Sequence, residues 1–218
     1  MKPAPWGGVF RDGRDLFTVN RTPGASVYGE ALVSGDGVEY RKWDPFRSKL
    51  AGLLLKGPSA ELLGNPRSIL YLGAAHGTTV SHLSDAFPDA AIFAIEKSPT
   101  SFAPLLELSR HRAGILPILA DAQLPERYQA DVGPVDLLYQ DVAQRNQAGI
   151  FVENARACLA EHGRGLLMLK VRSVTQRGTS ASVVREARTT LAGAGFSVRE
   201  ETPLAPFARE HVALSIRE

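Results

Sequence analysis

Between residues 68 and 216 of this 218-residue chain, short apolar runs alternate with longer amphipathic stretches. This alternation is typical of βαβ units, in which a helix crosses over the sheet between two parallel strands. Strands are expected at 68–72, 91–95, 115–119, 135–140, 165–171, 196–202 and 211–216. Helices are expected at 78–87, 99–111, 146–160 and 180–193. The short stretch PLAPFAREH between the last two strands favours an antiparallel C-terminal hairpin. The pattern therefore predicts a Rossmann-like α/β fold on a seven-stranded, mostly parallel sheet.

The first 43 residues have a different pattern, that of short hairpins. Turns are expected at Asp12-Gly13, Pro23-Gly24 and Gly35-Asp36-Gly37, between runs of alternating apolar residues. We therefore expect a small β-rich domain at 1–43, followed by a larger α/β domain at 44–218. A unit of a few hairpins is too small to be stable alone, so it should pack on the larger domain.

A helix is expected at the start of the larger domain, in the stretch WDPFRSKLAGLLLKG. Asp44 is a suitable N-cap, Pro45 suits the first helical position, and Gly57 suits the helix end. The helix would lead the chain into the first strand of the predicted sheet.

Composition limits the class of protein. A chain of this length can bury a core without disulfides or metals. Its one cysteine, Cys158, excludes an internal disulfide and a cysteine-based zinc site, and it fits a reducing cytosol. Neither a membrane span nor a signal core is expected, so we predict a cytoplasmic protein that binds no membrane. A net charge of +2 permits a nucleic-acid partner but does not by itself indicate one.

The stretch ILYLGAAHGTTVSHL predicts a strand, a tight turn and a helix start, an arrangement that presents backbone N–H groups to a nucleotide-like cofactor. Ligands of doubly wound sheets bind at the carboxyl ends of the strands, where acidic residues follow three of the predicted strands here. Glu96 lies 19 positions after Gly77, close to the spacing of an acid that binds ribose hydroxyls. Asp121 could accept a hydrogen bond from an adenine amino group. Together with Asp141, these acids predict a pocket for an adenosine moiety.

The residues expected to bind the sugar do not by themselves distinguish NAD from S-adenosylmethionine as the cofactor. The glycine pattern favours the second, because Ala74 and Ala75 stand where a dinucleotide-binding turn normally has stricter glycines. A further acid near the turn, Asp141, also suits a cationic sulfonium better than a pyrophosphate.

Five stretches, taken together, resemble the fibrillarin family, and in particular its short archaeal members. They are WDPFRSKLAGLL, LYLGAAHGTTVSH, DVAQRNQAGIFVENA, LKVRS and PFAREH, which occur in order over almost the whole chain. The resemblance implies a class I S-adenosylmethionine-dependent methyltransferase acting on ribose 2′-hydroxyls of rRNA and tRNA. A Gly/Arg-rich N-terminal extension like that of the nucleolar form is not seen, which favours the prokaryotic form.

The resemblance also implies the site residues. Cofactor contacts are expected from the first turn and from the residues that follow three further strands: Gly73, Ala74, Ala75, Thr78, Thr79, Glu96, Lys97, Asp121, Ala122, Asp141, Val142, Ala143 and Gln144. The catalytic set of the family would be Lys49, Asp141, Lys170 and His211. Departures from the family pattern occur at His76, Lys97, Thr100 and Arg145, outside that set.

A ribose hydroxyl is a weak acid, so its attack on a methyl group benefits from a positioned base. A lysine can serve if burial and a neighbouring cation lower its pKa. We expect Lys170 in that role, oriented by Asp141, while Lys49 and His211 position the ribose or an adjacent phosphate. Alignment of hydroxyl, methyl and sulfur would supply much of the rate.

The family also implies partners: a box C/D guide RNA that selects the target, a Nop-domain scaffold protein, and a kink-turn-binding ribosomal-type protein. The chain has no RNP1-like motif or strong basic run, which is compatible with leaving target selection to a guide. Among its scattered basic residues, Arg172 is the best candidate for an RNA contact. The alternatives are a stand-alone methyltransferase on another substrate, an NAD enzyme of similar architecture, and a noncatalytic particle component that retains the fold.

Overall fold

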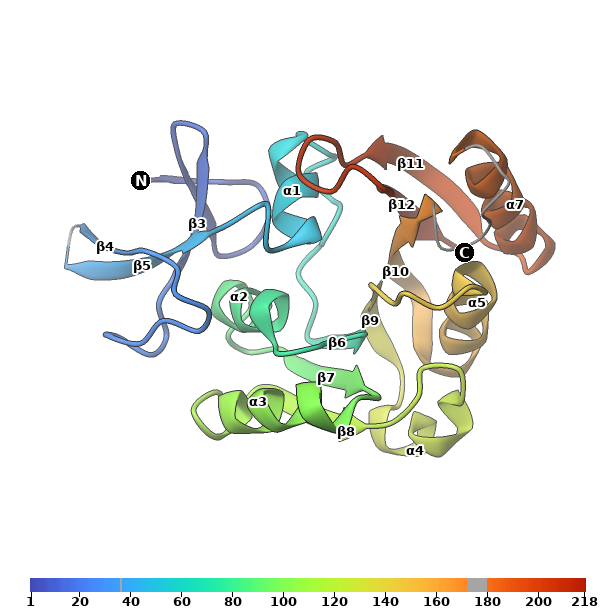
Figure 1. Cartoon of the computed structure of the whole chain (residues 1–218), viewed down its shortest axis with the longest axis horizontal. Coiled ribbons are helices and arrows are strands. Elements are labelled where there is room, and N and C mark those ends of the chain that lie inside the picture. Colours follow the sequence, from blue (N-terminus) through green and yellow to red (C-terminus); the bar gives the residue numbers. More distant parts are fainter. Residues whose placement is uncertain (36, 172–179) are drawn as a thin grey trace.

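The structure is a computed structural model that describes residues 1–35, 37–171 and 180–218. Figure 1 shows a small N-terminal sheet beside a larger sheet that is covered by helices. Asp36, in the middle of one expected turn, lies outside the described residues, as does Arg172, the expected RNA contact. Among the described residues, no helix is long and apolar enough to cross a membrane.

The small sheet has five antiparallel strands in the order β1-β2-β3-β5-β4. They are β1 (Lys2–Pro3), β2 (Val9–Asp12), β3 (Asp15–Val19), β4 (Leu32–Gly35) and β5 (Val38–Trp43). The predicted turn after Asp12 joins β2 to β3. The predicted Pro23-Gly24 turn is closed by the Ala25 N–H, which donates to the Thr22 carbonyl over 3.0 Å, and Gly24 has the positive φ of +80° that favours glycine.

The main sheet has seven strands in the order β11-β12-β10-β9-β6-β7-β8. They are β6 (Ser68–Leu72), β7 (Ala91–Glu96), β8 (Ile115–Leu119), β9 (Val135–Gln140), β10 (Leu159–Lys170), β11 (Ser197–Pro203) and β12 (His211–Arg217). Strand β12 is antiparallel to both of its neighbours, whereas the pairs among β6 to β10 are parallel. The predicted mostly parallel sheet with a C-terminal antiparallel hairpin is therefore confirmed.

The helices are α1 (Lys49–Leu55), α2 (Thr78–Ala86), α3 (Pro99–Arg110), η1 (Pro125–Arg127), α4 (Gln129–Val132), α5 (Gln147–Cys158) and α7 (Ser180–Gly193). The expected cap of the first helix is wrong. The carboxylate of Asp44 accepts the Phe46 N–H and closes a turn, and the helix is capped by Ser48 instead. Strand β10 also begins earlier than expected, directly after α5, with a register shift before Arg164.

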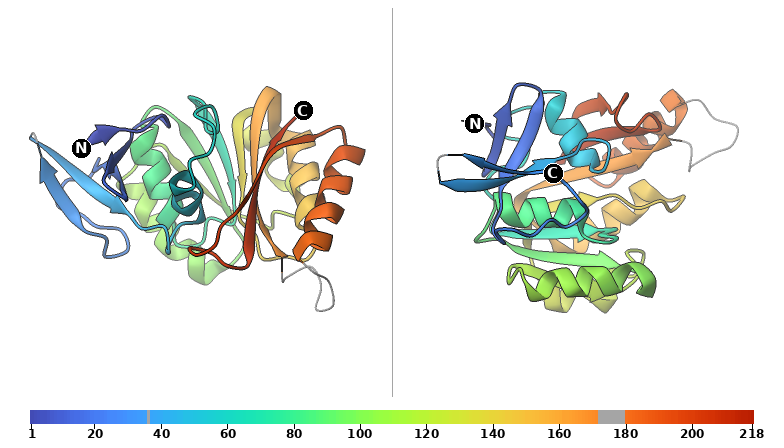
Figure 2. Two further views of the ribbon diagram at one scale, coloured as in Figure 1. Left: turned by 90° about the horizontal axis from the view of Figure 1, so that it is seen from above. Right: turned by 60° about the vertical axis from the view of Figure 1, so that its left-hand side comes forward.

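The two faces of the main sheet have different partners. Buried residues of α1, α2 and α3 form one apolar cluster with one face and with residues of the small sheet, such as Leu16 and Trp43. Residues of α4, α5 and α7 form a second cluster on the other face. Figure 2 shows the small sheet on one side of the main sheet and α7 on the opposite side. The small sheet thus shares its core with the helices beside it, as its size predicts. The domain boundary at residue 43 stays a prediction.

Candidate active site

The turn after β6 is held in place by the end of β7. The N–H groups of Gly73 and Ala74 both donate to the Ile95 carbonyl over 3.0 Å, and the Ala75 N–H donates to Oε2 of Glu96 over 2.9 Å. Gly73 has a φ of +84°, and a Cβ there would collide with the carbonyl oxygen of Asp141. Glycine is therefore required, because β6 and β9 approach closely where both strands end.

A cavity of about 340 Å³ opens at these strand ends. Its lining comes from the turn after β6 and from the ends of β7, β8 and β9: Gly73, Ala75, Ile95, Glu96, Lys97, Ala120, Ala122, Asp141, Val142, Ala143 and Gln144. Most of the expected cofactor residues are therefore brought together. Ile95 and Ala120 were missed, although each stands directly before a residue or pair that was predicted.

Asp121 lies at the rim of this cavity and is fixed by its neighbours. Its carboxylate accepts the Gln123 N–H over 3.0 Å and the side-chain amide of Gln144 over 2.8 Å. Burial by itself would raise the pKa of Asp121. The two hydrogen bonds and the nearby Lys97 outweigh this effect, so the pKa lies below its ordinary value. The side chain is thus held as a carboxylate.

Besides Asp121, three expected contact residues are not among the residues that line the cavity. Ala74 is buried beneath the turn, and Thr78 is the first residue of α2. The hydroxyl of Thr79 lies 2.9 Å from the hydroxyl of Ser48, so it joins α2 to the start of α1. A role of these residues in binding a cofactor stays a prediction.

The four expected catalytic residues gather beside the same cavity. Lys49 is the first residue of α1, and its Nζ lies 2.7 Å from Oδ2 of Asp141, which also lines the cavity. Lys170 and His211 stand directly opposite each other at the ends of β10 and β12. The backbone of Lys170 is held by Gln147, whose side chain accepts the Lys170 N–H and donates to its carbonyl.

The charges in this cluster do not balance. Burial raises the pKa of Asp141 above its ordinary value, although Lys49 and Lys170 oppose the shift. Burial, together with the charges of Lys49 and Lys170, lowers the pKa of His211 to about 4, so its imidazole is neutral at pH 7. Asp141 was expected to orient Lys170, but its hydrogen-bonded partner in the structure is Lys49. Among the described residues, the Lys170 ammonium has no ion-pair partner.

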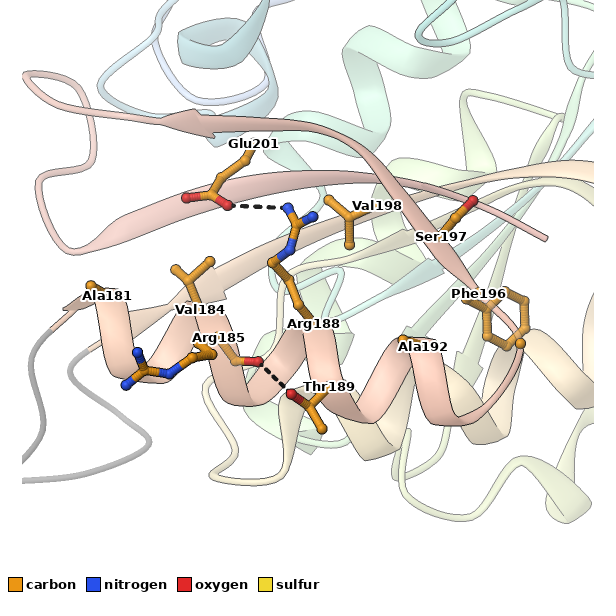
Figure 3. Close-up of a pocket in the computed structure, with 11 residues that line it drawn as sticks. Ala181, Val184, Arg185, Arg188, Thr189, Ala192, Phe196, Ser197, Val198 and Glu201 are labelled. Atoms are coloured by element: carbon orange, nitrogen blue, oxygen red, sulfur yellow. Dashed lines mark hydrogen bonds and ion pairs between the residues drawn. The ribbon is translucent and has the colours of Figure 1, made fainter.

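Another groove, of about 740 Å³, lies between α7 and the edge strand β11. Val184 and Phe196 are among the apolar residues that line it (Figure 3). Its charged groups already have partners or point outward: Arg188 contacts Glu201 over 3.4 Å. It lies at the edge of the sheet, away from the ends of β6, β7 and β9. The smaller cavity is therefore the candidate site.

Three features define the class of protein: the strand order, the single antiparallel strand β12, and the acidic residues at the ends of β7, β8 and β9. These features are those of a class I S-adenosylmethionine-dependent methyltransferase. The family model for fibrillarin matches residues 6–217, and the chain belongs to the fibrillarin family.

Individual relatives agree with this assignment. A fibrillarin-like rRNA/tRNA 2′-O-methyltransferase of Methanothermobacter thermautotrophicus is 39% identical over 96% of this chain and 94% of its own length. The Aeropyrum pernix fibrillarin crystallised with natively bound S-adenosyl-L-methionine superposes with a TM-score of 0.89 at 40% identity, covering 99% of this chain and 96% of that one. A fibrillarin/Nop5p complex superposes with a TM-score of 0.88 at 39% identity, covering 97% of each chain.

Proposed function

We propose that this chain transfers a methyl group from S-adenosylmethionine to ribose 2′-hydroxyls of rRNA and tRNA. One observation carries the proposal: Asp141 belongs both to the wall of the adenosine-sized cavity and to the cluster with Lys49, Lys170 and His211. A methyl donor held in the cavity and a hydroxyl held by the cluster would therefore meet at this residue. The membership of the fibrillarin family supports the same reaction.

The residues of the cavity fit the proposed cofactor. Carboxylates of Glu96 and Asp141 line an otherwise largely apolar space, Asp121 is hydrogen-bonded to the lining residue Gln144, and Lys97 is the one cation among the lining residues. Such a lining suits ribose hydroxyls, an adenine amino group and a sulfonium charge, whereas a pyrophosphate would meet mostly like charge. When bound, S-adenosylmethionine supplies an electrophilic methyl group.

The cluster would provide the remaining chemistry. Lys170, as a neutral amine, would accept the proton of the 2′-hydroxyl while the oxygen bonds to the methyl carbon, the methyl–sulfur bond breaks and S-adenosylhomocysteine leaves. Asp141 would hold Lys49, whose charge would stabilise a nearby phosphate. The neutral ring of His211 keeps a lone pair with which it can accept a hydrogen bond from the ribose.

We further propose that a box C/D guide RNA selects the target, within a particle that contains a Nop-domain protein and a kink-turn-binding ribosomal-type protein. The relative in complex with Nop5p supports the Nop-domain partner. Guidance remains an inference from the family.

The test is methyl transfer from labelled S-adenosylmethionine to matched RNA in the reconstituted particle. Methylation at one guide-specified ribose, lost in Lys170→Ala, is expected. Lys42→Ala is a matched control, because Lys42 is a half-exposed lysine of the small sheet paired with Asp15. Activity that survives in Lys170→Ala would assign the base to another residue. Transfer without a guide would favour a stand-alone enzyme, and cofactor binding without transfer would favour a noncatalytic component.

A further inference from the structure

An aromatic pair lies on the surface next to the candidate catalytic cluster. Phe46 stands in the turn that leads into α1 and is 67% exposed, the largest value among the large hydrophobic residues that the structure describes. Its ring meets that of Phe207, from the loop between β11 and β12, with centroids 5.3 Å apart and planes at 71°. A phenyl ring with this exposure contributes little to the core, so the fold does not explain its position.

Both rings are held firmly by local structure. The Phe46 N–H donates to the carboxylate of Asp44 over 2.8 Å, which fixes the turn. Phe207 packs directly over Gly52 of α1, where an added Cβ would lie 3.1 Å from it. Its N–H donates to the Leu204 carbonyl. The pair is therefore a preformed surface rather than two loose side chains.

Chain connectivity places this surface at the cluster. Phe46 comes three positions before Lys49, and Phe207 comes four positions before His211. Any RNA whose ribose reaches Lys49, Lys170 and His211 has neighbouring nucleotides that must cross the surface around these residues.

The charges around the pair suit RNA. The ammonium of Lys56 lies 5.8 Å from the centre of the Phe207 ring, and Arg47 is exposed beside Phe46. The pair belongs to two segments, residues 44–56 and 204–211. In them the cations Arg47, Lys56 and Arg209 outnumber the carboxylates, Asp44 and Glu210. Bases that leave the stack of a duplex bind to aromatic faces flanked by cations.

We propose that Phe46, supported by Phe207, is a stacking platform for the base of a nucleotide adjacent to the one that is methylated. The proposal rests on the proposed function and adds a positioning element to it. Sequence is not read at this point, because every base has a π-face.

The test measures steady-state methylation by the complete particle with Phe46 variants. Phe46→Ala should raise the KM for RNA about five- to tenfold, the lower part of the range for one stacked base, with the KM for S-adenosylmethionine unchanged. Phe46→Tyr should have the KM for RNA of wild type. Phe46→Leu should raise this KM almost as much as Phe46→Ala, because leucine has no ring on which a base can stack. Leu106→Ala is the matched control, because Leu106 is an exposed apolar residue of α3. An unchanged KM for RNA in Phe46→Ala would overturn the proposal.

A second measurement keeps the two proposals distinguishable. Substrate RNA with 5-iodouridine next to the target nucleotide should form a photo-cross-link to the peptide that contains Phe46. If wild type forms this cross-link but transfers no methyl group, the proposed function fails and the platform stands. If methylation is normal but no such cross-link forms, the platform fails alone. Weakened binding of the Nop-domain protein to Phe46→Ala without RNA would assign the pair to a protein interface and overturn the proposal.

Discussion

Two groups of charged residues lie on the same face of the main sheet, and they differ in how their charges are matched. The buried network consists of Glu30, Arg41, Asp85 and Arg112. Arg41 contacts Glu30 and Asp85 over 2.6 Å each, Arg112 also contacts Asp85, and all four side chains are at most 2% exposed. In the candidate catalytic cluster, two lysines face one carboxylate and a neutral histidine.

The difference separates a stabilising role from a reactive one. In the buried network two cations meet two anions. The Thr18 hydroxyl donates to Asp85, and the hydroxyls of Ser81 and Thr22 accept hydrogen bonds from Arg41 and Arg112. Such a set joins the small sheet to α2 and has no capacity left for a ligand. The candidate catalytic cluster keeps an excess cation and partial exposure, with the Lys49 and Asp141 side chains 27% and 19% exposed. Unmatched charge next to a cavity is a property of sites that bind or react.

The largest effect is expected from Asp85→Ala in the buried network. It would leave the guanidinium groups of Arg41 and Arg112 without their shared carboxylate, at a cost of about 3–5 kcal/mol in the free energy of unfolding. Urea denaturation measures this loss. A loss below about 1 kcal/mol would mean that the network contributes little to the packing of the small sheet on α2.

Asp141→Asn should have the opposite effect to Asp85→Ala, lowering the turnover number without lowering the stability. The fold raises the pKa of Asp141, so the ionised side chain is less favourable in the folded than in the unfolded chain at pH 7. The amide should therefore leave the stability equal to or above that of wild type, while the turnover number falls about 10²–10³-fold through loss of the charge. Urea denaturation and methyl-transfer assays at pH 7 test the two parts. A marked loss of stability would place Asp141 with the buried network instead.

The ionisation of His211 should sharpen the contrast. Its pKa of about 4 in the folded chain lies below the ordinary value of 6.5, so the unfolded chain takes up the proton first. This histidine therefore contributes no pH dependence above about 6.5, and stability falls as the pH drops from there toward 4. An NMR titration of the imidazole, assigned with His211→Asn, should have its midpoint near 4. A midpoint near 6.5 would show that neither burial nor the charges of the two lysines act on the ring.

The smallest effect is expected from Lys97→Ala. Lys97 lies 3.9 Å from Asp121, and its side chain is 56% exposed, so solvent screens the pair. Exposed ion pairs contribute less than about 1 kcal/mol, so cofactor affinity should change less than about fivefold. Calorimetric titration with S-adenosylmethionine tests this, with Asp121→Asn as the comparison. A larger change would give Lys97 a direct contact with the cofactor.

Much of the fold could be predicted because its signals are local. Apolar periodicity located the seven strands of the main sheet, and the turn residues Asp12-Gly13 located the hairpin of β2 and β3. The start of α1 was misplaced, since Asp44 and Ser48 are both good caps. The choice between them depends on the Thr79 hydroxyl of another helix.

The sequence by itself determined the architecture and most of the cavity, because the carboxyl ends of parallel strands always meet at one edge of the sheet. Glu96, Asp121 and Asp141 could therefore be placed together without coordinates. Only the tertiary structure decided which charges pair. Lys49 reaches Asp141 across 92 positions, and in the buried network Arg41 and Arg112 reach Asp85 across 44 and 27 positions. Pairing depends on burial and on distances between distant segments, and no local pattern of residues encodes either.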